Sequence, residues 1–122
     1  SAFARQLCEL ERSSGFALVV TEPLPAGEAL IGAVARLALD SERRDAEFAI
    51  IVGREIGGLG LGIFLMKRLI DYARRRRLDV LWGDVREENS AMLAVCDELG
   101  FKRSHHPEEL GIVRVSKRLR SD

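Results

Sequence analysis

Five glycines gather between an apolar, strand-like run and an apolar, helix-like run near the middle of the chain. The stretch reads AEFAIIVGREIGGLGLGIFLMKRLIDYA, and its glycines are Gly53, Gly57, Gly58, Gly60 and Gly62. Glycine lets backbone N–H groups approach an anion closely, and the N-terminus of a helix favours negative charge. The pattern therefore predicts a phosphate-binding loop.

Two common phosphate-binding motifs do not fit this loop. A nucleotide P-loop needs Lys and then Ser or Thr directly after its last glycine, but Gly62 is followed by Ile63 and Phe64. A dinucleotide fingerprint needs a third glycine where Ile63 stands and an acid at the end of the next strand, whereas Asp79 begins that expected strand. The third candidate ligand is coenzyme A.

The rest of the chain predicts the elements that must position this loop. Apolar residues at helical spacing predict helices, and short apolar or alternating runs predict strands. Helices are expected over Ala2–Ser14, about Gly60–Arg76 and about Glu88–Leu99, and strands over Phe16–Glu22, Ala29–Asp40, Ala46–Val52, Asp79–Val85 and Gly111–Leu119, with a turn at Pro23–Gly27 and a hairpin loop at Ser41–Asp45. The order begins α-β-β-β-α-β-α and ends in the strand Gly111–Leu119, which predicts an α/β or α+β layer with a mixed sheet covered by helices.

Length and composition indicate one domain over residues 1–122, enough to bury about two-thirds of the unfolded surface. Lys plus Arg and Asp plus Glu each total 19, so the zero net charge gives no global case for nucleic acid or an acidic membrane surface. No run is long enough to span a bilayer, and no signal peptide is visible. Cys8 and Cys96 lack metal-like spacing, which favours free thiols in a reducing cytoplasm. The start at Ser1 favours a processed protein or a domain of a longer chain.

Two motifs in this order resemble the GCN5-related N-acetyltransferase (GNAT) family. GLGLGI, at residues 58–63, is similar to motif A of that family, in which Gln or Arg-x-x-Gly-x-Gly or Ala opens a long helix after a central strand. ENSAMLAVCDELGF (Glu88–Phe101) is similar to the second signature, an Asn that opens a helix ending in Leu-Gly-Phe. The likeness covers about Gly15–Leu119 and is greatest to bacterial protein-lysine acetyltransferases.

The resemblance implies a mostly antiparallel mixed sheet with an acetyl-CoA cleft between splayed central strands. The pyrophosphate would lie on amides of the glycine loop, the pantetheine arm would pair with the backbone of the central strand, and Asn89 would touch the coenzyme. By position, the loop residues are Gly57, Gly58, Leu59, Gly60, Leu61, Gly62 and Ile63, and the strand residues are Ala49, Ile50, Ile51 and Val52. Acetyl-CoA would be a cosubstrate, and no metal is implied.

Glu47 is the candidate general base for acetyl transfer to an amine. A lysine of pKa about 10.4 is neutral only about once in 2,500 molecules at pH 7, so a positioned base helps. Glu47 lies inside an apolar strand, where loss of hydration moves a carboxylate towards base function. The resemblance also places the base of the protein-lysine enzymes at this residue. The alternative is a strand-edge glutamate that pairs with Arg36 or Arg44.

Cys96 stands where the family has its general acid, a Tyr seven residues after the Asn that opens the helix. A thiol of pKa about 8.5 can protonate the leaving thiolate. The alternative is a cysteine that simply packs on a helix face.

Departures from the family pattern favour two further hypotheses. The family's Gln or Arg falls on Gly57 and a basic or polar loop residue falls on Leu59, which leaves backbone amides and the helix dipole to hold phosphate. Together with Cys96, these losses favour a degenerate acyl-CoA-binding regulatory domain without turnover. A small-molecule amine acetyltransferase is the third hypothesis.

The resemblance also implies partners and a missing part. The acceptor is expected to be a protein lysine or a small amine, and a fused or neighbouring acyl-CoA synthetase-like module is implied. The chain is expected to lack the family's first strand and helix.

Three other features complete the prediction. Arg74–Arg77 ends a helix, as a solvated face or as a contact for the coenzyme's 3′-phosphate. His105 and His106 have no Cys or acid at ligand spacing, so no metal site is predicted. Trp82 is expected in the core or at the rim of an acceptor groove.

Overall fold

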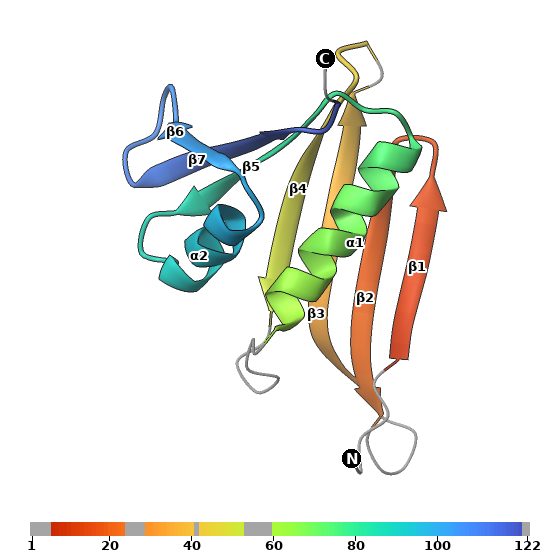
Figure 1. Ribbon diagram of the computed structural model, residues 1–122. Coiled ribbons are helices and arrows are strands. Elements are labelled where there is room, and N and C mark those ends of the chain that lie inside the picture. The colour runs from red at the N-terminus through yellow and green to blue at the C-terminus, as the bar shows by residue number, and fades with distance from the viewer. Residues whose placement is uncertain (1–5, 24–28, 41, 53–59, 121–122) are drawn as a thin grey trace.

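The computed structural model describes residues 6–23, 29–40, 42–52 and 60–120. Within these ranges, seven strands form one sheet in the order β1-β2-β3-β4-β5-β7-β6 (Figure 1). The strands are β1 (Gln6–Arg12), β2 (Gly15–Pro23), β3 (Ala29–Asp40), β4 (Asp45–Val52), β5 (Val80–Arg86), β6 (Lys102–His105) and β7 (Ile112–Arg118). The helices described there are α1 (Leu61–Arg75) and α2 (Ser90–Glu98).

Neighbouring strands are antiparallel except at the centre, where β4 and β5 are parallel. Parallel strands need a crossover connection, and α1 provides it between β4 and β5. The predicted mixed, mostly antiparallel sheet with helices is confirmed.

The first segment is a strand, and the helix predicted over Ala2–Ser14 is wrong. β1 forms a hairpin with β2, in register from Gln6↔Thr21 to Arg12↔Gly15. The prediction took the spacing of Leu7 and Leu10 for the buried face of a helix. Both side chains are exposed in the strand, so the spacing does not mark a buried face. Tertiary partners override such weak local patterns.

Side chains of α1 supply those tertiary partners for β1. Glu9 pairs with Arg68, and Glu11 accepts a 2.7 Å hydrogen bond from the hydroxyl of Tyr72. The backbone of β1 also pairs with the edge of β2 that faces away from β3. A strand satisfies both sets of interactions at once.

The core lies between the sheet and α1, which crosses one sheet face (Figure 1). The predicted stripe of α1, spaced every four residues, is buried: Leu61, Leu65, Leu69 and Ala73. On β4, Ala46 and Phe48 are buried towards this side, while the alternating Glu47, Ala49 and Ile51 are exposed on the other face. That alternation decides which side chains of β4 are open to a substrate. No helix in the described ranges has the length and apolar character to cross a membrane.

Candidate active site

The two central strands part after only three residue pairs. β4 and β5 are in register at Asp45↔Val80, Ala46↔Leu81 and Glu47↔Trp82, and they diverge beyond that point (Figure 1). From residue 48 to residue 52, β4 keeps its pairing with β3. Within the described ranges, no strand pairs with its other edge there. This edge carries Ala49, Ile50, Ile51 and Val52, the residues predicted to pair with pantetheine.

The ring of Phe48 packs in the core, on the helix side of the sheet, where the strands begin to diverge. Phe48 follows the last paired residue of β4 and is 4% exposed. Its ring packs over Gly83 of β5 and edge-on against Phe101, with ring centroids 5.7 Å apart. A side chain at position 83 would overlap this ring, so glycine is needed there.

The N-terminus of α1 lies at the open end of this divergence (Figure 1). Gly60 is its N-cap residue, with φ 78°, a left-handed conformation that glycine adopts without strain. The N–H groups of Leu61, Gly62 and Ile63 have no acceptor within the helix, and among the described residues no side chain caps it. Such a helix end favours an anion. Gly57, Gly58 and Leu59 lie outside the described residues.

The α-carbon of Gly62 faces α2, while its N–H group belongs to the free end of α1. A methyl group added there would face α2 and lie 3.5 Å from Cγ2 of Val95. That is ordinary contact, so this glycine sits at the contact between α1 and α2.

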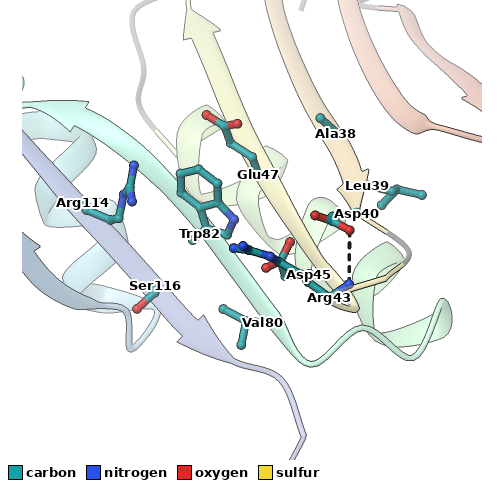
Figure 2. A pocket seen from close by; sticks show the side chains of 10 residues that line it. All are labelled: Ala38, Leu39, Asp40, Arg43, Asp45, Glu47, Val80, Trp82, Arg114 and Ser116. Atoms are coloured by element: carbon teal, nitrogen blue, oxygen red, sulfur yellow. Dashed lines mark hydrogen bonds between the residues drawn. The ribbon is translucent and has the colours of Figure 1, made fainter. Parts of the chain in front are cut away.

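A groove of about 440 Å³ lies on the sheet face away from the helices, at the closed end of the divergence (Figure 2). Its lining comes from β3, β4, β5, β7 and the β3–β4 turn: Ala38, Leu39, Asp40, Arg43, Asp45, Glu47, Val80, Trp82, Arg114 and Ser116. Figure 2 shows Trp82 between Glu47 and Arg114. Trp82 is half-buried and lines the groove, in agreement with a rim position.

Glu47 is exposed, so the expected loss of hydration is not found. The reason is the strand alternation, which turns Glu47 to the face that α1 does not cover. The alternative prediction, that Glu47 pairs with Arg36 or Arg44, is also wrong. Arg44 donates to the carbonyl of Arg77 and lies 3.9 Å from Asp79, and no described residue forms an ion pair with Glu47.

Arg114 is a groove residue that the sequence reasoning missed. Its Nε and Nη2 donate to the two carboxylate oxygens of Asp84 at 2.9 and 3.1 Å, and its Cζ lies 4.4 Å from the ring centroid of Trp82. Hydrogen bonding to Asp84 raises the pKa of Arg114, and the charge of Glu47 raises it further. The signal was the alternation of the last strand, which places Arg114 and Ser116 on one face.

Asn89 caps α2, and its Oδ1 accepts the backbone N–H of Met92 at 3.1 Å. This bond leaves the side-chain NH₂ group for other partners. Contact between Asn89 and the coenzyme stays a prediction.

Cys96 is fully buried in the core on α2. Burial, with a smaller effect of the charge of Asp97, raises the pKa of this thiol to about 11. A proton donor must reach the leaving thiolate, and a side chain without exposed surface offers no route. The packed alternative is the one that this position favours.

The arginine run ends α1 at its other end from the glycine loop. Arg74–Arg77 is exposed, and a helix of 15 residues separates the run from Gly60 by about 20 Å. This distance favours a solvated face over contact with a coenzyme bound at the loop. Among the described residues, no group of three His, Cys, Asp or Glu side chains could hold a metal ion.

The sequence relatives found by comparison with known proteins are acetyltransferases. A family model described as Acetyltransferase (GNAT) domain matches residues 1–102. An acetyltransferase of Pseudomonas aeruginosa is 31% identical over 101 residues, which is 83% of this chain and 53% of the relative. The [ribosomal protein bS18]-alanine N-acetyltransferase of Salmonella typhimurium is 35% identical over 69 residues, 52% of this chain and 47% of that protein. The chain thus spans about half the length of these curated relatives.

Solved structures share the fold. A spermidine N-acetyltransferase from Vibrio cholerae, in complex with CoA and spermine, has a TM-score of 0.72 at 23% identity, over 88% of this chain and 67% of that one. The GNAT domain of S. lividans PAT has a TM-score of 0.70 at 21% identity, over 89% and 64%. Because the family model covers most of the sequence and the fold agrees, the chain belongs to the GNAT acetyltransferase family.

Proposed function

We propose that this protein transfers the acetyl group of acetyl-CoA to an amine, with Glu47 as the general base. One observation carries the proposal. Glu47 is the last residue of β4 that pairs with β5, so its carboxylate lies where the free strand edge ends and the groove begins. A coenzyme along the edge and an amine in the groove would meet beside Glu47.

Two backbone features support the coenzyme cleft. The edge of β4 at residues 49–52 offers N–H and C=O groups to the amides of a pantetheine arm, as an added strand would. The free N–H groups of Leu61, Gly62 and Ile63 suit the pyrophosphate. Each interaction uses backbone groups, so the loss of polar side chains at Gly57 and Leu59 leaves it intact.

The chemistry needs one proton acceptor. The amine nitrogen attacks the carbonyl carbon of the thioester, the carbon–sulfur bond breaks, and the coenzyme leaves as a thiolate. The proton lost by the amine passes to the carboxylate of Glu47, directly or through one water molecule. Such a base contributes typically about 10²–10⁴-fold to the rate.

The acceptor that the sequence predicts is a protein lysine. The groove lies on an open sheet face, which suits a side chain presented by another molecule. A small-molecule amine is the second candidate, because the groove volume of about 440 Å³ is also sufficient for one. The implied acyl-CoA synthetase-like module remains a sequence prediction.

A Glu47→Gln variant tests the proposal. Calorimetry should find about one acetyl-CoA per chain for both the wild type and the variant, since the carboxylate takes no part in holding the coenzyme. Thiol release with a panel of lysine peptides and small amines should fall by about 10²–10⁴-fold in the variant. Glu98→Gln, an equivalent change at an exposed residue of α2, is the matched control and should keep the wild-type rate. Equal rates for Glu47→Gln and wild type would remove Glu47 as the base, and coenzyme binding without any turnover would favour a regulatory domain.

A further inference from the structure

One wall of the groove is an arginine stacked on an indole. Arg114 of β7 and Trp82 of β5 line the groove together with Glu47 (Figure 2). The guanidinium carbon lies 4.4 Å from the ring centroid, within the range of a cation–π contact. In Figure 2 the ring of Trp82 lies between this positive charge and Glu47.

Asp84 fixes the guanidinium of Arg114 through hydrogen bonds to one edge of the group. Both oxygens of Asp84 accept from Arg114, through Nε and Nη2. A bidentate pair of this kind sets the orientation of the guanidinium plane. The Nη1 group of Arg114 has no protein partner among the described residues, and the side chain is 31% exposed. Donors of Arg114 are thus left for a ligand.

The carboxylate of Asp84 is itself in contact with His106, which follows β6. Nε2 of His106 lies 3.6 Å from Oδ2 of Asp84, while Nδ1 of the same ring accepts the backbone N–H groups of Glu108 and Glu109 at 3.0 and 2.9 Å. Because Nδ1 is an acceptor, Nε2 carries the ring proton and faces Asp84. Residues of β5, β7 and the turn after β6 therefore hold the guanidinium of Arg114 in this orientation.

We propose that Arg114 selects acceptors that carry a carboxylate close to the amine that is acetylated. The inference rests on the proposed function, because it assumes that the amine lies beside Glu47. The free donors of Arg114 then bind an oxygen of the acceptor on the other side of Trp82. An ammonium group at that place would face a fixed positive charge.

The opposite end of the groove adds to this discrimination. Asp40 and Asp45 line it at the β3–β4 hairpin, next to Arg43. A carboxylate is disfavoured beside these two acids and favoured beside Arg114, so the acceptor enters in one orientation. The carboxylate can come from an acidic residue beside a lysine in a peptide, or from a small amine that carries its own.

The test compares acceptors that differ only in charge. Three peptides share one lysine, with Asp, Asn or Arg as its neighbour, and a small amino acid is compared with its uncharged amide. For the wild type, kcat/KM should be about tenfold or more higher for the acidic member of at least one set, mainly through KM, as expected for one charge-assisted hydrogen bond. The set that shows the preference identifies the source of the carboxylate.

Charge reversal gives the decisive comparison. Arg114→Glu should reverse the preference towards the peptide with a neighbouring Arg, and the KM for acetyl-CoA should stay unchanged. Arg114→Gln, which keeps length and hydrogen bonding, should abolish the preference and serves if the reversal disturbs folding. Arg75→Glu, the same charge change at an exposed position of α1, should keep the wild-type preference.

The outcomes separate this inference from the proposed function. A wild type that acetylates all acceptors with equal kcat/KM overturns the role of Arg114 and leaves the acetyltransferase assignment in place. The same holds if Arg114→Gln retains the acidic preference. A wild type that binds acetyl-CoA and acetylates no acceptor overturns both.

Discussion

The ring of Phe48 lies directly against the backbone of Gly83, so that a methyl group added at Gly83 would lie 2.6 Å from Cε2 of the ring. These two residues follow the last parallel pair of β4 and β5, Glu47↔Trp82. The opening between the central strands is thus occupied, on its helix side, by an aromatic ring in the core.

Gly83→Ala should destabilise the protein by about 1–3 kcal/mol, the usual effect of overpacking a core. The nearest atoms belong to a buried ring that also packs against Phe101, so it cannot move away freely. The measurement is the free energy of unfolding in denaturant. A variant as stable as the wild type would show that the ring does not constrain the divergence.

Two glycines of the loop should respond oppositely to alanine. Gly60→Ala should cost about 1–2 kcal/mol, because its φ of 78° is left-handed, and should weaken acetyl-CoA binding by disturbing the helix end. Gly62→Ala should stabilise α1 by about 0.5–1 kcal/mol, since its methyl group meets only ordinary contact with Val95. Its affinity for acetyl-CoA should remain that of the wild type. Weaker binding by Gly62→Ala in calorimetry would mean that the α-carbon of Gly62, and not only its N–H group, faces the ligand.

The two ends of the Asn89 side chain can be tested separately. Asn89→Ala should lose about 0.5–2 kcal/mol of stability with the cap of α2. Asn89→Asp keeps the capping oxygen and should keep the stability, but it places a carboxylate where the predicted coenzyme contact is an NH₂ group. Its affinity for acetyl-CoA should fall. Unchanged affinity in Asn89→Asp would contradict the predicted contact.

Cys96 should make stability depend on pH in the alkaline range. Below pH 9 the thiol is protonated in both states; between its reference pKa of 9.0 and the folded pKa of about 11, only the unfolded thiol ionises. Stability should therefore fall as pH rises, by about 2 kcal/mol from pH 8 to 10.5. Cys96→Ala should lack this part of the decline, while other titrating groups act equally in both proteins. Parallel curves for the two proteins would rule the effect out.

The hydroxyl of Tyr72 should contribute to holding β1 on α1. It donates to Glu11 at 2.7 Å and accepts from Arg76 at 2.9 Å, while the ring stacks on Phe16. Tyr72→Phe keeps the ring and should lose about 0.5–1.5 kcal/mol of unfolding free energy. Glu11→Gln keeps an acceptor oxygen and should lose less. Glu11 also lies 3.5 Å from Nη1 of Arg76, and a larger loss in Glu11→Gln would point to this ion pair rather than to the hydroxyl.

Local sequence was sufficient for the elements with strong periodicity. It also singled out Glu47 as the candidate base, a role that stays a prediction. The four-residue repeat from Leu61 to Ala73 predicted α1, and the alternation of Gly111–Leu119 predicted β7. The acid before the glycine loop was found because one charged residue stands in an apolar run. These signals are local, since each depends on neighbours within one element.

Tertiary structure alone decided what those elements meet. Residues 6–12 became a strand because β2 and the side chains of α1 offered partners that lie far away in sequence. Glu47 faces solvent because only one face of β4 is covered by α1, which an apolar run does not reveal. Arg114 joined Trp82 and Asp84 through the pairing of β5 with β7, and residues 30 positions apart in sequence came within hydrogen-bonding distance. Sequence patterns report burial along one element, whereas the site depends on register between strands, and register is fixed by the packed sheet.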